Sequence, residues 1–361
     1  TSGCIETGSF GKEAYLLTGY FNTPKVLEIT LNDGIDPATG TRLGPSTGDP
    51  RDFTSFEDLY RAFETQLRWF VDVKVEVNQY IEWIFARYCP APFLSVVIRD
   101  CIEKGRDYYD GGPRYNTTYI QCCGIGTATD SLSALRTHVF DPGGGVAMDD
   151  LLAALERDFE GDEPLRQRLL NRTPRFGNDD DRADALMQRI YGSLVDTIDG
   201  RPNTRGGRYH LDMLSTTCHV YFGTRIGATP DGRRAGLPIS DGTSPAQGAD
   251  RCGPTAVCRS LGKMDQVRSG GTLLNQRFLP QVLAGDGGMD SLAALIRTYF
   301  RLGGHHIQFN VVGTETLRAA QANPDDYRDL LVRVAGYSDY FVDIGRDLQE
   351  EIISRTAQEG W

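Results

Sequence analysis

The chain has 361 residues, of which 40% are hydrophobic and 24% are charged, and its formal net charge is −11. This composition is typical of a globular protein, and the length predicts about two domains. The acidic balance, without a cluster of Lys and Arg to offset it, argues against a nucleic-acid partner. The sequence contains no run of about 18 apolar residues, which argues against a membrane helix.

The first hundred residues predict two helices joined by a loop. Residues 11–22 follow a glycine-rich stretch and are predicted to form a short helix. Residues 30–52 are rich in Gly, Pro, Asp and Thr and are predicted to form a long connecting loop. Residues 53–88 carry apolar side chains at helical spacing. The sequence TSFED at 54–58 is typical of a capping box, so we expect a long helix to begin there and to end before Pro90.

The rest of the chain alternates between the two kinds of element. Residues 110–135 predict a strand, a turn and a helix that begins at about Asp130. The acidic run at 179–181 is interpreted as the solvated start of a helix, where the helix dipole favours acids, and not as a metal site. Further helices are predicted at 147–159, 179–198, 290–302 and 348–356, and buried strands at 211–223 and 305–313. The expected class is therefore α/β with a mainly parallel sheet.

The cysteines do not predict a metal centre. None of the eight forms a CxxC pair, so neither a zinc ribbon nor an iron–sulfur cluster is expected. Eight cysteines in 361 residues are too few for a disulfide-dense scaffold, and we expect reduced thiols. His305 and His306 are adjacent in a predicted strand, where side chains alternate between faces, so the pair could not bind one metal.

Cys4 and Glu6 are the first candidates for chemistry. A thiol can act as a nucleophile or as a hydrogen-atom donor, and a carboxyl can move protons. A nucleophilic thiolate would need a basic neighbour, and no histidine is close to Cys4 in the sequence. Because an isolated cysteine is more often a small buried hydrophobe, these two residues alone leave a structural role open.

A second stretch, RVAGYSDYF at 333–341, gives Cys4 a partner. Together, SGCIE near the start and RVAGYSDYF near the end resemble the glycyl radical enzymes, in which a cysteine in a GCxE motif pairs with a glycine in an RVxGYxxxF motif. Segments such as GKEAYLLTGYFN, RPNTRGGRY, TTCHVYFG, GGTLLNQRF and GGHHIQFNVV extend the resemblance along the chain. It implies that the chain is the C-terminal half of a longer protein, as its start without Met also suggests.

The resemblance implies a mechanism with three residues. An activating enzyme that uses S-adenosylmethionine and an iron–sulfur cluster removes a hydrogen atom from Gly336, which stores the radical. Glycine suits this role because a Cα radical is planar and glycine can flatten without a side-chain clash. Cys4 passes its hydrogen atom to Gly336 and then, as a thiyl radical, takes one from the substrate. Glu6 serves as general acid or base, and no metal is required in this chain.

Within the family, the string GCIETGSFGKEAYLLTGYFN most resembles the hydroxyproline dehydratases, which convert 4-hydroxyproline to pyrroline-5-carboxylate. Cys4 would then abstract a ring hydrogen beside the carbon that bears the hydroxyl group. Tyr20 and Thr216 fall where this branch places pocket residues, although plain packing would also explain both. Because Ile5, and not a second cysteine, follows Cys4, pyruvate formate-lyase chemistry is not expected.

The resemblance also implies the architecture and the setting. We expect a ten-stranded α/β barrel of two parallel half-barrels set antiparallel, with residues 1–300 in the barrel domain and 301–361 as the glycyl radical domain. A small-molecule substrate, a homodimer and the cytoplasm of an anaerobe are implied, without nucleic acid or membrane. Alternatives are another eliminating member of the family, an arylacetate decarboxylase with the same Cys and Gly chemistry, and an inactive structural relative.

Overall fold

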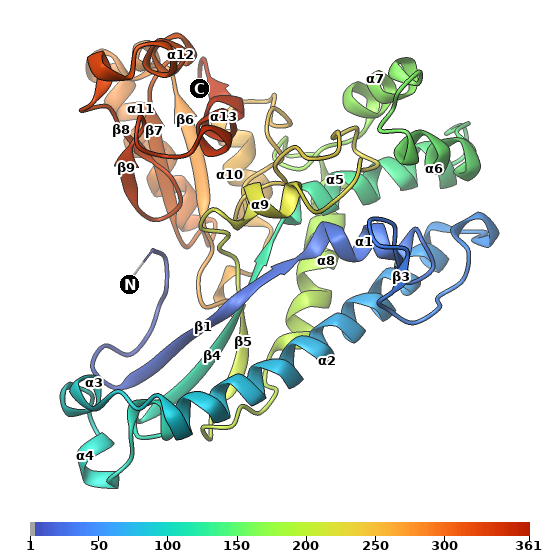
Figure 1. Cartoon of the computed structure of the whole chain (residues 1–361). Coiled ribbons are helices and arrows are strands. Elements are labelled where there is room, and N and C mark those ends of the chain that lie inside the picture. Colours follow the sequence, from blue (N-terminus) through green and yellow to red (C-terminus); the bar gives the residue numbers. More distant parts are fainter. Residues whose placement is uncertain (1–3) are drawn as a thin grey trace.

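Two parallel sheets form the centre of the computed structural model, which describes residues 4–361 (Figure 1). One has the strand order β1-β4-β5 and the other β10-β6-β7. Two antiparallel hairpins, β2–β3 and β8–β9, complete the strands. The bounds are β1 Glu13–Asn22, β2 Ile35–Asp36, β3 Thr41–Arg42, β4 Tyr115–Cys123, β5 Arg208–Asp212, β6 Leu274–Phe278, β7 Ile307–Val311, β8 Leu331–Arg333, β9 Ser338–Tyr340 and β10 Ala357–Gln358.

The two sheets meet at one point. A parallel bridge between Met213 and Thr272 joins the end of β5 to the segment that leads into β6. Five parallel strands therefore follow one another in the order β1-β4-β5-β6-β7, which corresponds to half of the ten strands expected for the barrel. The register between β1 and β4 shifts between Leu17 and Tyr20, as it does at a β-bulge.

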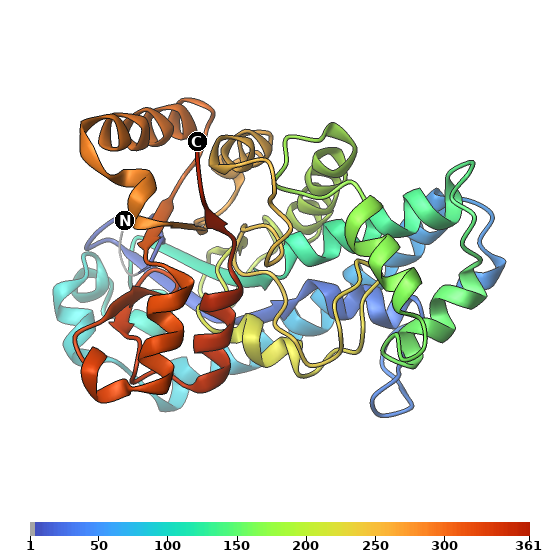
Figure 2. The ribbon, with the colours of Figure 1, turned by 90° about the horizontal axis from the view of Figure 1, so that it is seen from above.

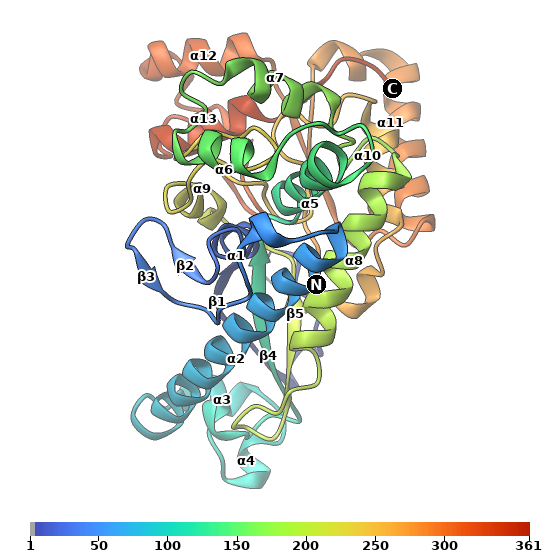
Figure 3. The same ribbon diagram turned by 90° about the vertical axis from the view of Figure 1, so that its right-hand side faces the viewer.

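Helices cover the outside of these strands (Figure 3). The longest, α2, begins at its N-cap Ser55, whose side chain accepts a hydrogen bond from the Asp58 amide, as the capping sequence predicts. The bounds are α1 Thr23–Thr30, α2 Phe56–Tyr88, α3 Pro92–Val97, α4 Cys101–Lys104, α5 Ile125–Leu135, α6 Met148–Glu156, α7 Glu163–Arg172, α8 Asp181–Ile198, α9 Cys218–Gly223, α10 Pro254–Gly262, α11 Gly285–Arg301, α12 Thr314–Ala322 and α13 Arg346–Ser354. Single helical turns occupy Pro50–Asp52, Tyr108–Asp110, Gln266–Arg268, Pro280–Leu283 and Pro324–Tyr327, and a π-helical turn Arg136–Phe140.

The two largest of three apolar clusters contain most of the buried apolar side chains. The larger one lies between the β1-β4-β5 sheet and helices α2, α5 and α8, and α2 contributes a stripe that includes Phe63, Leu67 and Val71. The smaller cluster lies beneath the C-terminal hairpin, the orange and red group in Figure 2, and it also includes Ile5 from the start of the chain. Because Ile5 is fully buried there, the packing anchors the Cys4 segment against the C-terminal group.

Two predicted elements are wrong. Within the predicted helix 11–22, residues 13–22 instead form strand β1, which pairs in parallel with β4. The predicted strand at 211–223 ends at Asp212, and its second part is helix α9. Helix α5 also begins at Ile125, five residues before the expected start.

The remaining predicted helices and the strand in 305–313 are present, and the class with parallel sheets is confirmed. The acidic run at 179–181 does start helix α8, with Asp180 as its N-cap. Within residues 4–361, no helix combines the length and the apolarity that a bilayer crossing requires.

Candidate active site

Gly336 lies at the tip of the β8–β9 hairpin. Arg333 pairs with Ser338 at the end of the ladder, and the Val334 amide donates a hydrogen bond to the Tyr337 carbonyl across the turn. Gly336 itself has a φ of +79°, in the left-handed region that side chains other than glycine rarely adopt. The left-handed backbone of the turn is therefore one reason why this position carries glycine.

The second reason is the contact between Gly336 and Cys4. A Cβ built on Gly336 would lie 2.9 Å from Cys4 Sγ and 2.7 Å from its Cα, and closer still to its Cβ. Both distances are well below ordinary van der Waals contact. The structure thus brings together the two residues that the paired motifs single out, although 332 positions separate them in the sequence.

Both polar groups of the Gly336 backbone are engaged. Its amide donates to Gln308 Oε1 at 2.9 Å, and its carbonyl accepts from Arg333 Nη2 at 3.0 Å. Arg333 Nε also donates to Gln308 Oε1, at 3.1 Å, so the two side chains hold each other as well as the glycine. The sequence analysis did not identify Gln308, which lies within the ordinary-looking strand β7.

A buried ion pair supports the hairpin from helix α13. Arg355 Nη2 donates to the Val334 carbonyl at 3.2 Å and to Glu351 Oε2 at 2.8 Å. Glu351 is in turn 3.4 Å from His219 Nε2 of α9, and neither of these side chains is exposed. Because a buried charge needs partners, the network fixes the distance between α13 and the hairpin.

The Cys4 thiol keeps its proton. Burial raises the pKa of Cys4 above its ordinary value, and the nearby Glu6 carboxyl raises it further, whereas Arg333 lowers it. The S–H form therefore predominates at neutral pH. A raised pKa is the opposite of what a nucleophilic thiolate requires, and it suits a thiol that gives up a hydrogen atom.

Glu6 is buried beside Cys4. Its side chain is 5% exposed, and Oε2 accepts a hydrogen bond from the Ile5 amide at 2.9 Å. The loop rests on two glycines, because the Thr7 amide donates to the Gly270 carbonyl and a Cβ on Gly271 would lie 2.8 Å from the Ile5 carbonyl oxygen. The glycines allow this close approach and so determine where the Glu6 carboxyl lies.

Tyr20 and Thr216 are in direct contact. Tyr20 Oη donates a hydrogen bond to Thr216 Oγ1 at 2.8 Å, and burial raises the pKa of the tyrosine. Thr216 has a φ of +48°, which is a rare conformation for a β-branched residue and marks local strain. The geometry therefore brings together the two predicted pocket residues.

The sequence analysis missed Asp212, the last residue of β5. Its side chain is fully buried, and neither carboxyl oxygen has a hydrogen-bond partner among residues 4–361. Burial, followed by the charge of Glu6, raises the pKa of Asp212 well above its ordinary value. The sequence offered one signal for Asp212, an acidic residue inside a predicted strand. In the sequence, however, this residue looked like the ordinary alternation of polar and apolar residues along a strand.

His305 and His306 have different surroundings. His305 Nε2 lies 3.0 Å from the Ile5 carbonyl oxygen and 3.2 Å from Thr7 Oγ1, so it holds the Cys4 loop from the side. Burial lowers the pKa of His306 to about 4, so that this ring is neutral at pH 7. In the described part of the chain, no group of three or more His, Cys, Asp or Glu side chains could hold a metal ion.

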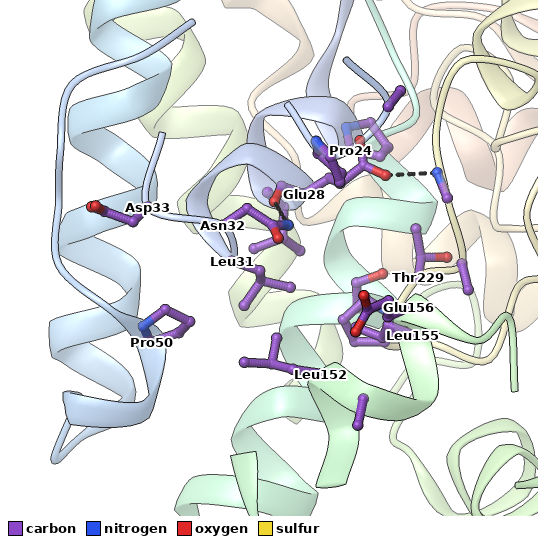
Figure 4. A pocket seen from close by; sticks show the side chains of 18 of the residues that line it. Pro24, Glu28, Leu31, Asn32, Asp33, Pro50, Leu152, Leu155, Glu156 and Thr229 are labelled. Atoms are coloured by element: carbon purple, nitrogen blue, oxygen red, sulfur yellow. Dashed lines mark hydrogen bonds between the residues drawn. The ribbon is translucent and has the colours of Figure 1, made fainter. Parts of the chain in front are cut away.

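A cavity of about 640 Å³ lies far from these residues in the fold, between α1, α6 and the loop that carries Thr229 (Figure 4). Its polar groups include Glu28, whose Oε1 already accepts a hydrogen bond from the Gly227 amide at 2.6 Å. Neither Cys4 nor Gly336 lines it. We therefore place the candidate active site at the contact between the Cys4 loop and the Gly336 hairpin.

Comparisons with known proteins find relatives along almost the whole chain. Residues 1–223 match the family model "Pyruvate formate lyase-like", and residues 239–342 match "Glycine radical". The chain is 55% identical over 358 residues to trans-4-hydroxy-L-proline dehydratase of Clostridioides difficile, which covers 99% of this chain and 45% of that protein.

Solved structures give the same result. A crystal structure of hydroxyproline dehydratase from Clostridioides difficile with trans-4-hydroxy-L-proline bound matches 99% of this chain and 45% of its own, with a TM-score of 0.97. The glycerol-bound B12-independent glycerol dehydratase from Clostridium butyricum is 38% identical, with a TM-score of 0.95 and the same two coverages. The chain thus spans less than half the length of these relatives, and the expected barrel type is confirmed.

Proposed function

The chain belongs to the pyruvate formate-lyase-like glycyl radical enzymes, and we propose that the protein dehydrates 4-hydroxyproline to pyrroline-5-carboxylate. The observation that carries the proposal is the contact of Cys4 with the Gly336 backbone, with a buried Glu6 two residues from the thiol. The substrate follows from the 55% identity to a dehydratase of trans-4-hydroxy-L-proline.

In this proposal Gly336 stores the radical. Its amide and carbonyl flank the radical carbon, and the hydrogen bonds to Gln308 and Arg333 keep both groups in one orientation. The Cys4 S–H bond breaks as its hydrogen atom moves to Gly336, and the resulting sulfur radical takes a hydrogen atom from the substrate ring. Cys4 returns that atom to the product and becomes a sulfur radical again. This radical takes a hydrogen atom from Gly336, so the thiol and the glycyl radical are both regenerated at the end of each cycle.

In this proposal Glu6 is the general acid that protonates the leaving group. When the C–O bond of the substrate radical breaks, the electron pair leaves with oxygen, and a proton from Glu6 converts the departing hydroxide to water. General acid catalysis of this kind contributes about 10²–10⁴-fold to a rate. Tyr20 and Thr216, joined by their hydrogen bond, would line the pocket, and the product iminium later returns one proton to Glu6.

The proposal includes the setting. An activating enzyme that carries S-adenosylmethionine and an iron–sulfur cluster would remove the hydrogen atom from Gly336, and the chain itself would contribute no metal ligand. We further propose a homodimer. Because an exposed glycyl radical reacts with oxygen, we also propose that the protein works in the cytoplasm of an anaerobe. Residues 1–300 as barrel and 301–361 as radical domain remain a prediction.

One observation favours a second candidate, an arylacetate decarboxylase. A decarboxylase of this family is expected to place a histidine near the substrate, and no histidine precedes His138 in the sequence. The fold nevertheless brings His305 to the Cys4 loop, within 3.0 Å of the Ile5 carbonyl oxygen. Another eliminating member of the family and an inactive relative are further outcomes of the same test.

The test uses the full-length protein, activated without oxygen. The 4-hydroxyproline stereoisomers and a set of arylacetates are offered, and water loss and carbon dioxide are followed by mass spectrometry, with a Cys4→Ser control. Dehydration of one hydroxyproline isomer supports the proposal, and carbon dioxide release replaces it with the decarboxylase. A glycyl radical signal without either product leaves another eliminase, and no signal after activation indicates the inactive relative.

A further inference from the structure

Residues 215–217, which we call the pocket loop because they include the predicted pocket residue Thr216, continue directly into helix α9. The amide of Cys218, the first residue of α9, donates a hydrogen bond to the Ser215 carbonyl at 2.8 Å. This bond closes the loop onto the start of the helix. His219 lies in the first turn of α9, so the position of its side chain follows the position of the pocket loop.

The side chain of His219 is fully buried and contacts helix α13. Its Nε2 lies 3.4 Å from Glu351 Oε2, and neither ring nitrogen hydrogen-bonds to any other group within residues 4–361. Burial acts against a charge on Glu351, but the charge of Arg355, followed by His219, holds the pKa of that carboxyl well below its ordinary value. Glu351 is therefore ionised, and it is the group that gives the buried imidazole a polar partner.

Glu351 in turn orients the guanidinium of Arg355. Arg355 Nε donates to Glu351 Oε1 at 3.0 Å and Nη2 donates to Oε2 at 2.8 Å, and this two-pronged pair leaves the planar guanidinium little freedom. Nη2 also donates to the Val334 carbonyl at 3.2 Å. Since Val334 precedes Gly336 by two residues in the hairpin, the contacts of Glu351 end beside the glycine.

A second set of contacts joins the pocket loop to the same carbonyl. Ser215 Oγ accepts a hydrogen bond from the Gly242 amide at 3.3 Å. The preceding residue, Asp241, accepts at Oδ2 from Asn275 Nδ2, which also donates to the Val334 carbonyl at 3.3 Å. The pocket loop is therefore tied to the hairpin from two sides, through α9 and through the segment at 241–242.

We propose that His219 is a positioning residue that joins the pocket loop to the Gly336 hairpin and so keeps the Gly336 Cα against the Cys4 sulfur. The inference rests on the proposed function, in which Gly336 stores the radical and Thr216 lines the substrate pocket. His219 touches no reacting atom and acts only through the Glu351 ion pair. Because coupling between two sites is reciprocal, a substrate bound at the pocket loop should also hold the hairpin more firmly.

Two substitutions test this role in the unactivated full-length protein. His219→Leu removes both ring nitrogens, whereas His219→Gln offers Glu351 a side-chain N–H in their place. We expect amide hydrogen exchange in the hairpin, residues 331–341, to become about tenfold faster in His219→Leu, as for the loss of one contact in a buried network. In His219→Gln the exchange should return to the wild-type rate.

His138→Leu is the matched control. His138 is also buried, but its Nε2 lies 3.0 Å from Thr173 Oγ1, at the end of α7 and not at the hairpin. This variant should leave the exchange of the hairpin amides unchanged. His219→Phe, which also lacks ring nitrogens, takes the place of His219→Leu if the leucine variant does not fold.

A second measurement follows the contact between Gly336 and Cys4 itself. The one hydrogen that remains on the Gly336 radical carbon splits its electron paramagnetic resonance signal. In D₂O, reversible transfer with the Cys4 thiol, whose hydrogen exchanges with solvent, replaces this hydrogen by deuterium and removes the splitting. The rate of this loss per radical should fall about tenfold in His219→Leu and stay at the wild-type value in His219→Gln and His138→Leu.

A third measurement tests the link to the pocket loop. A bound 4-hydroxyproline isomer should slow hairpin exchange in the wild type and in His219→Gln, but not in His219→Leu. Equal hairpin exchange in the wild type and His219→Leu would overturn the proposal. Equal acceleration in His138→Leu would do the same, because the effect would then reflect overall stability. If His219→Leu alone loosens the hairpin but no hydroxyproline isomer is turned over, the proposed function is wrong and the role of His219 at the hairpin stands.

Discussion

Gly336 and Cys4 are packed so closely that a side chain on the glycine would occupy the space of the cysteine. A Cβ on Gly336 would lie 2.9 Å from the sulfur, and the left-handed φ of +79° separately disfavours any other residue. The same contact brings the Cα hydrogen of Gly336 to the thiol. One arrangement thus accounts for both the conformation and the chemistry expected of this position.

The first prediction concerns Gly336→Ala. The substitution introduces the clash with Cys4 and about 1–3 kcal/mol of backbone strain, so the melting temperature should fall by several degrees, and no glycyl radical signal should appear after activation. Electron paramagnetic resonance and thermal unfolding measure the two effects. Cys4→Ser is the matched control, because it should keep both the radical signal and the stability while losing turnover. An alanine variant as stable as wild type would contradict the close contact.

The second prediction concerns Gln308, whose Oε1 accepts from both the Gly336 amide and Arg333. Gln308→Leu leaves the glycine amide without its acceptor, at a cost of about 1–3 kcal/mol, and frees the hairpin tip. We expect a lower yield of the radical and a shorter lifetime, measured by spin quantitation over time. Gln308→Glu retains the accepting oxygen and should restore most of the yield. Equal yields in all three proteins would show that the hydrogen bond does not matter.

The sequence predicts the site better than it predicts the elements. The motifs around Cys4, Glu6 and Gly336 identify residues that the fold then brings together, because their spacing is specific to one family. Strand β1 was mistaken for a helix, since a strand with apolar residues on both faces lacks the alternation that marks a strand. The short apolar run 218–223 is equally ambiguous by periodicity and proved to be helix α9.

The missed residues share one property. Asp212 is buried by tertiary packing, and Gln308 contacts a segment that is distant in the sequence. Each lies in a strand, where a polar residue looks like ordinary alternation. No local pattern indicates that the Asp212 carboxyl is sealed or that Gln308 faces the Gly336 amide. Such roles depend on tertiary packing, which a single sequence does not reveal.

The third prediction follows from the raised pKa of Cys4. Burial and then Glu6 hold the thiol protonated, so its alkylation by iodoacetamide in the unactivated enzyme should have a midpoint above the ordinary thiol pKa of about 8.5. Glu6→Gln removes a charge that raises this pKa, so the midpoint should move to lower pH. Peptide mass spectrometry follows the reaction at Cys4, with the exposed Cys89 and Cys252 as internal references. A midpoint that rises in Glu6→Gln would contradict the assigned electrostatics.

The fourth prediction is a pH dependence of stability caused by Asp212. Its pKa is raised in the folded state, so the folded protein keeps a proton that the unfolded chain releases above about pH 3.9. Stability should therefore fall as the pH rises from there toward the folded pKa, by up to about 1.4 kcal/mol per pH unit from this group. Asp212→Asn should remove that contribution, so its unfolding free energy should gain on the wild type between pH 5 and 8. Parallel curves would mean that Asp212 is ionised in the fold.

The last prediction tests whether the strain at Thr216 serves the site. A β-branched residue at a φ of +48° costs on the order of 1–3 kcal/mol, whereas glycine adopts this conformation freely. Thr216→Gly should therefore stabilise the protein by about 1 kcal/mol while removing the hydroxyl that accepts from Tyr20 Oη, which should lower kcat/KM about tenfold. Thr216→Ser keeps the hydroxyl and should retain activity. If glycine instead destabilises the protein, the conformation is not strained, and the 2.8 Å hydrogen bond between Tyr20 and Thr216 is a packing contact and not part of a pocket.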